Sequence, residues 1–421
     1  MRRNRLWNAF VGTILAGSLA AIPAVSLADN WPGWRGPTGS GYCAEKDLPL
    51  KWDSKSKEGV LWKVPLKDAT GHSSPIVWED RVFVTTAAKQ TREEEARKDI
   101  PDHDISCYQA GDGKLLWKTH VPHGPLQEGY AIYAVPTPVT DGKAVYAWFG
   151  SAVVVAVDFD GKLLWRQERP GPFNLNPGLC TSLALYQDTV ILLCDQARGL
   201  AFLQGLDKNT GAVKWEQKRT KANCNNTTPL LMQVKGKPQM IIAGADKLEG
   251  LDPASGEPIW WCKTPGFGES PIAANGLVYA KSGNAPAVCV DPSGAGDVAK
   301  THVKWREAKI PGDYSSPVIC GNYICYVEKE GTIGCLKLST GEAVCSAKLD
   351  GVSKLASPVA TADGRVYFVS TGKSYVIKPG PTIEVLGGGN LNSGGNGSSP
   401  AVSNGRIFVR DFENLWCIGK K

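Results

Sequence analysis

Short apolar runs alternate with turn residues along almost the whole chain. The stretch LDKNTGAVKW at residues 206–215 shows the pattern: an apolar run, an Asn-Thr-Gly turn, a second run and a final Trp. Glycine supplies the positive φ of a tight turn, and Asp, Asn, Ser and Thr side chains hydrogen bond to the turn backbone. Each copy therefore predicts a β-hairpin. Further copies end at Trp117, Trp165, Trp260, Trp305 and Cys345.

A second motif alternates with the first. It begins with Ser or Thr, usually followed by Pro, and continues as an apolar run, a polar turn and another apolar run. Two hairpins in series make a four-stranded unit that cannot bury both faces by itself, whereas a ring of such units can. The eight copies, about 41 to 63 residues apart, begin at Ser73, Pro136, Thr181, Thr227, Glu269, Ser315, Ala356 and Ser398.

The two motifs together predict an all-β fold, an eight-bladed β-propeller of four-stranded antiparallel blades. The unit that begins at Ser398 has only three strands before the chain ends. Residues 60–66, VLWKVPL, offer the missing strand, with Trp62 as its aromatic residue. We therefore expect an N-terminal strand to close the last blade, which removes an exposed sheet edge. The propeller domain is expected to span residues 59–421.

The first 28 residues are typical of a cleavable export signal. A basic start precedes an apolar run of moderate length, and small residues lead to Ala28. Residues 29–58 would form an N-terminal extension, and we expect the mature protein to be periplasmic or secreted. No later apolar run approaches the roughly 20 residues that a membrane-spanning helix needs.

Charge narrows the choice of partner. Removal of residues 1–28 takes away three Arg and no acid, so the 47 basic residues become 44 against 41 acidic ones, a net charge of +3. This balance does not favour nucleic acid or acidic lipid as a partner. We expect a monomer that binds an envelope protein or glycan.

All twelve cysteines lie beyond the export signal, in a compartment where disulfides persist. No Cys-x-x-Cys occurs and the five His are scattered, so no metal site is predicted. Cys345 stands where other copies have Trp, and a hairpin around Thr340 would set Cys335 opposite it. This pair could form a cross-strand disulfide or remain two buried thiols, and both alternatives stay open.

The repeated LDKNTGAVKW pattern resembles the tryptophan-docking repeat of pyrroloquinoline quinone (PQQ) propellers. These include the quinoprotein alcohol dehydrogenases and the BamB-type scaffold of outer-membrane assembly. The stretches NWPGWRGPTGSG (30–41) and SSPAVSNGRIFVRDFENLWCIG (398–419) are similar to an exported bacterial PQQ-like propeller family. The resemblance implies that the final aromatic residue packs between neighbouring blades. That structural role would fall to Trp62, Trp117, Trp165, Trp215, Trp260 and Trp305, whereas the seventh unit has no Trp.

The resemblance implies two functions, and the residues favour the non-catalytic one. This is an extracytoplasmic, BamB-like scaffold that binds a protein or ligand and for which no cofactor is expected. The alternative is a quinoprotein alcohol or sugar dehydrogenase that depends on PQQ and calcium. Such enzymes carry two adjacent Cys against the quinone, but no adjacent Cys pair occurs in this chain. No catalytic or quinone-binding residue is therefore assigned.

A third class, a hydrolase or lyase, would place its chemistry on the propeller axis near the Ser/Thr-Pro motifs. The ionisable residues expected there are His72, Glu269 and Asp313. These axis-lining candidates could contact a ligand or simply line a water-filled channel. Elsewhere, one loop contains His120, His123 and Glu128, which could act as an acid–base pair or metal site.

Overall fold

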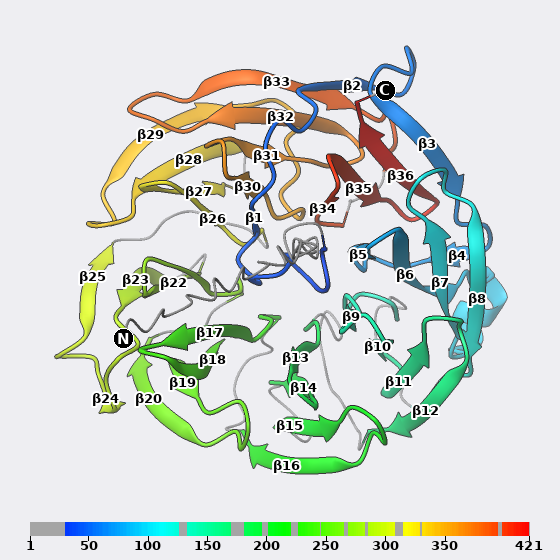
Figure 1. The fold of residues 1–421 in the computed structure, drawn as a ribbon, viewed down its shortest axis with the longest axis horizontal. Coiled ribbons are helices and arrows are strands. Elements are labelled where there is room, and N and C mark those ends of the chain that lie inside the picture. Colours follow the sequence, from blue (N-terminus) through cyan, green and yellow to red (C-terminus); the bar gives the residue numbers. More distant parts are fainter. Residues whose placement is uncertain are drawn as a thin grey trace, which may run out of the picture.

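The computed structural model describes residues 30–125, 133–169, 181–195, 201–219, 226–244, 246–264, 268–282, 285–307, 315–328, 331–394 and 398–420. Within them the strands form eight sheets, arranged around a central axis like the blades of a propeller (Figure 1). We number the blades in the order of the Ser/Thr-Pro motifs. The predicted export signal, residues 1–28, lies outside the described residues.

The first four blades contain consecutive strands, with the first strand of each nearest the axis and the last on the rim (Figure 1). Blade 1 has β5 (Ile76–Trp78), β6 (Arg81–Ala88), β7 (His103–Gln109) and β8 (Leu115–Val121); blade 2 has β9 (Val139–Thr140), β10 (Ala144–Phe149), β11 (Val153–Asp158) and β12 (Leu163–Glu168). Blade 3 has β13 (Ala184–Tyr186), β14 (Thr189–Cys194), β15 (Phe202–Asp207) and β16 (Val213–Lys218); blade 4 has β17 (Leu230–Val234), β18 (Lys237–Ala243), β19 (Lys247–Leu251) and β20 (Pro258–Lys263).

The remaining blades complete the ring. Blade 5 has β21 (Ile272–Ala274), β22 (Leu277–Ser282), β23 (Ala285–Val290) and β25 (Val303–Glu307); blade 6 has β26 (Val318–Cys320), β27 (Tyr323–Val327), β28 (Thr332–Lys337) and β29 (Ala343–Lys348). Blade 7 has β30 (Val359–Thr361), β31 (Val366–Phe368), β32 (Lys373–Lys378) and β33 (Glu384–Asn390); blade 8 has β34 (Ala401–Ser403), β35 (Arg406–Arg410), β36 (Asn414–Gly419) and β3 (Val60–Pro65).

The predicted fold class, an eight-bladed propeller of four-stranded antiparallel blades, is wrong in its blade composition. Only seven of the sheets are built around four antiparallel strands from one stretch of chain. The other sheet is composite, because β36 pairs with β3 from the N-terminal side, which is the closing strand that the sequence indicated. Several sheets also carry strands that the repeat did not predict.

These additional strands cover sheet edges that would otherwise be open, which explains the departure from a uniform repeat. Blade 7 gains β1 (Tyr42–Cys43) beside β30 and β2 (Lys51–Asp53) beside β33, both parallel. Blade 4 gains β24 (Gly296–Asp297), parallel to β20, and blade 1 gains β4 (Ala69–Thr70) beside β6. Residues 42–53, predicted as part of an extension, therefore join a propeller sheet.

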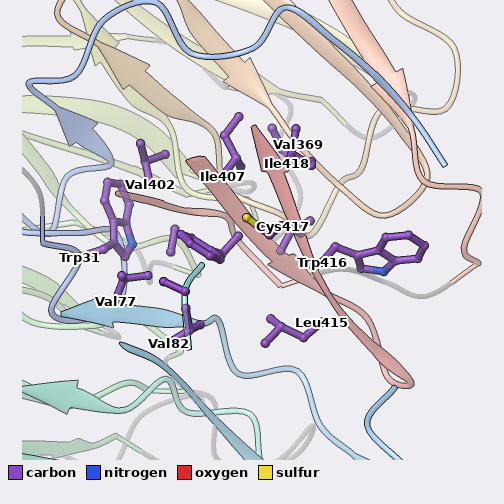
Figure 2. Packing of buried hydrophobic residues seen from close by; sticks show 14 of the residues in the cluster. Trp31, Val77, Val82, Val369, Val402, Ile407, Leu415, Trp416, Cys417 and Ile418 are labelled. Carbon is purple, nitrogen blue, oxygen red and sulfur yellow. The ribbon is translucent and has the colours of Figure 1, made fainter. Parts of the chain in front are cut away.

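The largest buried clusters lie between neighbouring blades. One cluster joins blades 7, 8 and 1, and it includes Trp31 from the N-terminal segment together with Val77, Val402 and Ile407. Figure 2 shows Trp31 beside residues of β34, β35 and β5 in this cluster. The ring is thus held together by apolar side chains from adjacent sheets, which is how units that cannot bury both faces alone become stable. No described helix has the length and apolar character needed to cross a membrane.

Candidate functional site on the propeller axis

A belt of hydroxyl groups surrounds the axis. The second residue of each motif, which stands directly before the proline or, in blade 3, before Leu183, donates its backbone N–H to the side-chain hydroxyl of the matching residue in the next blade, with N···O distances of 2.8 to 3.1 Å. Proline has no N–H to donate, and its place directly before the innermost strand costs the sheet no ladder bond. Among the described residues, seven such bonds join Ser74, Thr137, Ser182, Thr228, Ser270, Ser316, Ser357 and Ser399 in that order.

We expect Ser316→Ala to lower the free energy of unfolding by about 1–3 kcal/mol, because the buried N–H of Ser270 loses its acceptor. Urea unfolding of the purified protein measures the change. Ser316→Thr keeps the hydroxyl and should behave like the parent protein. Equal losses in both variants would show that the hydroxyl bond contributes little.

The N-terminal segment, residues 30–41, crosses the centre of this belt. Trp31 exchanges two backbone hydrogen bonds with Val77 of blade 1, at 2.8 and 2.9 Å. Farther along, the hydroxyl of Ser40 accepts a bond from Ala273 N–H of blade 5. Because blades 1 and 5 lie on opposite sides of the ring, the segment spans the axis, as Figure 1 shows for the blue chain in the centre.

Arg35 anchors the middle of that segment. Its side chain is buried, and Nη2 donates to the carbonyl oxygens of Pro317 in blade 6 (2.6 Å) and of Ser40 (3.0 Å). The guanidinium also lies 5.6 Å from the centre of the Trp34 ring. Burial lowers the pKa of Arg35 to about 9, so it remains protonated at neutral pH. The WRGP stretch therefore fixes the segment across the axis.

Glu269 is one of the three predicted axis-lining residues, and the structure buries it completely. Its Oε1 lies 2.8 Å from Nζ of Lys281 on β22, and the two side chains are 1% and 0% exposed. Lys281 also lies 5.6 Å from the ring centre of Tyr326 in blade 6. Burial, and then the Glu269 carboxylate, raise the pKa of Tyr279 well above its ordinary value. The carboxylate of Glu269 therefore has a charge partner, Lys281, within the same blade.

Of the other predicted ionisable residues, His72 and His120 are described, and neither contacts Glu269 in the described structure. His72 is half-buried and packs edge-on against Phe412, with ring centres 4.5 Å apart, at the seam of blades 8 and 1. Asp313 lies outside the described residues. His120 is largely exposed and lies 3.2 Å from Asp102, while its predicted loop neighbour Glu128 is not described. The sequence candidates therefore do not form one site in the described structure.

Sequence reasoning missed the charged and polar groups that link adjacent blades. Arg219 of blade 3 holds Asp195 through two bonds, at 2.6 and 3.1 Å, and reaches Glu249 of blade 4 at 2.6 Å. Burial alone would lower the pKa of Arg219, but the two carboxylates raise it. Arg410 of blade 8 donates to the Thr85 carbonyl of blade 1 at 2.7 Å. In the sequence, the signal for these links is a single charged residue within or next to an apolar strand.

His103 links blades 1 and 2 without carrying charge. It stacks on Phe149 with ring centres 4.3 Å apart, and Nε2 lies 2.6 Å from the Ser151 hydroxyl. Burial lowers the pKa of His103 to about 3, so the ring is neutral at ordinary pH. It therefore packs as an aromatic residue and has no charge to offer a ligand.

Five of the six motif tryptophans lie on the turn glycine of the next blade. The pairs are Trp62 with Gly113, Trp117 with Gly161, Trp165 with Gly211, Trp215 with Gly256 and Trp305 with Gly341. Each glycine has a positive φ, and a Cβ there would also strike the indole. Trp260 differs, because β24 pairs with β20, the rim strand that carries it. Trp260 is fully buried, and its Nε1 donates to the Gln239 side chain of its own blade. Their energetic role in holding the blades together stays a prediction.

Cys335 and Cys345 face each other in the register that the sequence suggested. Both are free thiols in the structure, with Cys335 buried and Cys345 half-buried. Cys345 donates to the carbonyl of Gly380 in blade 7 at 3.3 Å. The register is confirmed, whereas a disulfide between the two stays a prediction.

Residues 101–347, more than half of the chain, match the family described as outer membrane protein assembly factor BamB. The chain belongs to this family. No curated protein sequence matches it significantly.

Solved structures share the fold of this BamB-family chain. BamB from Moraxella catarrhalis is 15% identical with a TM-score of 0.61, covering 86% of this chain and 97% of its own. A europium-containing methanol dehydrogenase is 11% identical with a TM-score of 0.51, covering 93% and 98%. The computationally designed Ika8 protein is 12% identical with a TM-score of 0.54, covering 88% and 100%. At such low identities these likenesses describe the fold alone.

Several buried carboxylates of the described residues are already paired with cations of the same chain. Glu269 lies against Lys281, and Arg219 holds both Asp195 and Glu249. Within the described ranges, no group of three or more His, Cys, Asp or Glu is placed to hold a metal. Residues 30–41 of the chain itself cross the centre of the ring in Figure 1.

Proposed function

We propose that this BamB-family propeller is a non-catalytic scaffold that acts outside the cytoplasm, after export, and binds a protein of the cell envelope as a monomer. No cofactor is part of the proposal. The observation that carries it is an apolar stripe on the rim of three neighbouring blades. Its members, which are 40% to 48% exposed, are Leu115, Leu116, Leu163, Leu164 and Val213.

The stripe has the properties of a binding surface. Its residues occupy the one or two positions before Trp117, Trp165 and Trp215, so they lie at the same height on β8, β12 and β16. Elsewhere the chain covers rim strands itself, with β24 against β20 and β2 against β33. Exposed apolar groups that gather in one place on a protein are typical of interaction sites.

Internal pairing of buried carboxylates supports the non-catalytic part of the proposal. The buried carboxylates of Asp195, Glu249 and Glu269 each face a cation of the same chain. A catalytic acid or base needs to reach a substrate proton, and these groups are engaged in links within or between blades. The name of the matched family, an outer membrane protein assembly factor, suggests the envelope as the place of action.

A co-purification experiment tests the scaffold. The tagged mature protein should retain a stable envelope protein after crosslinking in cells, and the double variant Leu116→Asp/Leu164→Asp should lose it. Leu355→Asp is the matched control, because Leu355 is 37% exposed but lies away from the stripe. Equal capture by both variants would overturn the proposed surface. Tight binding of PQQ with calcium and alcohol-dependent dye reduction would overturn the non-catalytic reading.

A further inference from the structure

A row of three side chains recurs in the blades. In four blades an aromatic residue of the second strand and the motif Trp of the fourth strand meet above a small residue of the third strand. The ring centres are 5.5 to 6.2 Å apart. The rows are Phe83, Cys107 and Trp117; Tyr146, Ala156 and Trp165; Tyr279, Cys289 and Trp305; and Phe408, Cys417 and Trp62.

In blade 6 all three places of this row are cysteines. Cys325 of β27 lies opposite Cys335 of β28, which lies opposite Cys345 of β29. The sulfurs of Cys325 and Cys335 are 3.2 Å apart, and the Cys345 thiol is close enough to affect the pKa of Cys335. In blade 6, Cys325 and Cys345 thus stand at the two positions that are aromatic in the other rows. Each lies beside the thiol of Cys335, with which it can react.

The three thiols differ in access and reactivity. Cys325 and Cys335 are fully buried, whereas Cys345 is half-buried on the rim strand. The neighbouring thiol of Cys325, and more weakly that of Cys345, lower the pKa of Cys335 despite its burial. Burial raises the pKa of Cys345 to about 11. An external reagent therefore reaches Cys345 first, while the central thiol is the one most readily ionised.

We propose that Cys325, Cys335 and Cys345 form a thiol–disulfide exchange site that accepts oxidising equivalents from an external disulfide and stores them as a buried Cys325–Cys335 bond. The substrate class is a disulfide, RSSR, carried by a small molecule or a protein. The row is independent of the proposed scaffold surface, which lies on blades 1 to 3.

The exchange proceeds by successive thiolate attacks. The Cys345 thiolate attacks RSSR, forming a mixed disulfide and releasing RS⁻. The Cys335 thiolate then attacks the Cys345 sulfur, forming the Cys335–Cys345 bond and releasing a second RS⁻. Finally the Cys325 thiolate attacks the Cys335 sulfur, and Cys345 leaves as thiolate. Two protein thiols have lost two electrons and two protons, and RSSR has become two RSH.

The last step preserves the seam between blades 6 and 7. Cys345 donates its S–H to the Gly380 carbonyl, as the indole N–H groups of Trp62, Trp117 and Trp165 donate to a carbonyl of the next blade. A Cys335–Cys345 bond removes that donor, whereas a Cys325–Cys335 bond leaves it in place. The buried bond is therefore the resting form of the oxidised site.

Mass mapping of the whole mature protein tests the site. The reduced protein is incubated with oxidised glutathione, alkylated, and digested with trypsin, which separates the three cysteines by cutting after Lys329, Lys337 and Lys348. A Cys320→Ser background keeps the peptide of Cys325 unambiguous, since both lie between Lys309 and Lys329. We expect a Cys325–Cys335 crosslink with Cys345 alkylated. Three alkylated thiols at every glutathione ratio would overturn the proposal.

Single variants separate the roles. Cys345→Ser should slow formation of the Cys325–Cys335 bond at least about tenfold, because the buried pair loses its accessible thiol. Cys107→Ser is the matched control, since Cys107 takes the place of Cys335 in blade 1 but faces Trp117, and it should not change the rate. An unchanged rate in Cys345→Ser would show that Cys345 is not the point of entry.

Discussion

Replacement of Lys281 by Met is expected to lower the free energy of unfolding by about 3–5 kcal/mol, because removing one partner of a buried ion pair leaves an uncompensated charge. Glu269 lies 2.8 Å from the Lys281 ammonium, and both side chains are almost completely buried. Methionine has nearly the same length and shape as lysine, so the loss reports the missing charge more than a cavity. Urea unfolding at neutral pH measures it.

Two controls distinguish charge from packing. The double variant Lys281→Met/Glu269→Leu removes both charges and should recover most of the stability, since a buried pair can often be replaced by apolar residues at little cost. Lys373→Met breaks a pair with Asp350 on the surface, where both partners are well exposed, and should change stability far less. Comparable losses in Lys281→Met and Lys373→Met would contradict a special contribution of the buried pair.

The hairpin repeat could be predicted from the sequence because each copy forms the same short-range structure. The turn glycine Gly211 lies four positions before the aromatic Trp215, so the pattern is visible within one hairpin and recurs in the next blade. The Ser/Thr-Pro motif likewise marked the innermost strands. It could not show that these hydroxyls accept bonds from the preceding blade, since that contact joins residues more than 40 positions apart.

The candidate site was less predictable because its contacts depend on residues outside the repeat. Arg35 and Trp31 belong to a segment with no internal copy, and their neighbours are in blades 6 and 1. Glu269 was predicted to lie near the axis, but its cation, Lys281, lies within an apolar strand and was not predicted. A lone lysine in the run LVYAKS is the signal that could have indicated a buried pair.

We expect Trp52→Ala to lower the free energy of unfolding by about 3–5 kcal/mol, the usual loss for removing a buried Trp. Blade 7 lacks a motif Trp, and β2 supplies one from the N-terminal side: Trp52 is 2% exposed and lies against Gly389 of β33. The glycines of LGGGN leave room for this parallel strand, since a Cβ at Gly387 or Gly389 would strike β2 or the residue before it.

The matched control is Val385→Ala on the same strand, because Val385 is 49% exposed and its truncation should cost less than about 0.5 kcal/mol. Hydrogen exchange gives a second readout: the Gly388 N–H bonds to the Leu50 carbonyl and should lose protection in Trp52→Ala. If residues 29–58 were only an extension to a complete ring, Trp52→Ala would cost no more than Val385→Ala. A large loss confined to the tryptophan variant would instead mean that blade 7 depends on an aromatic residue more than 300 positions away in the chain, just as blade 8 depends on β3 for its last strand.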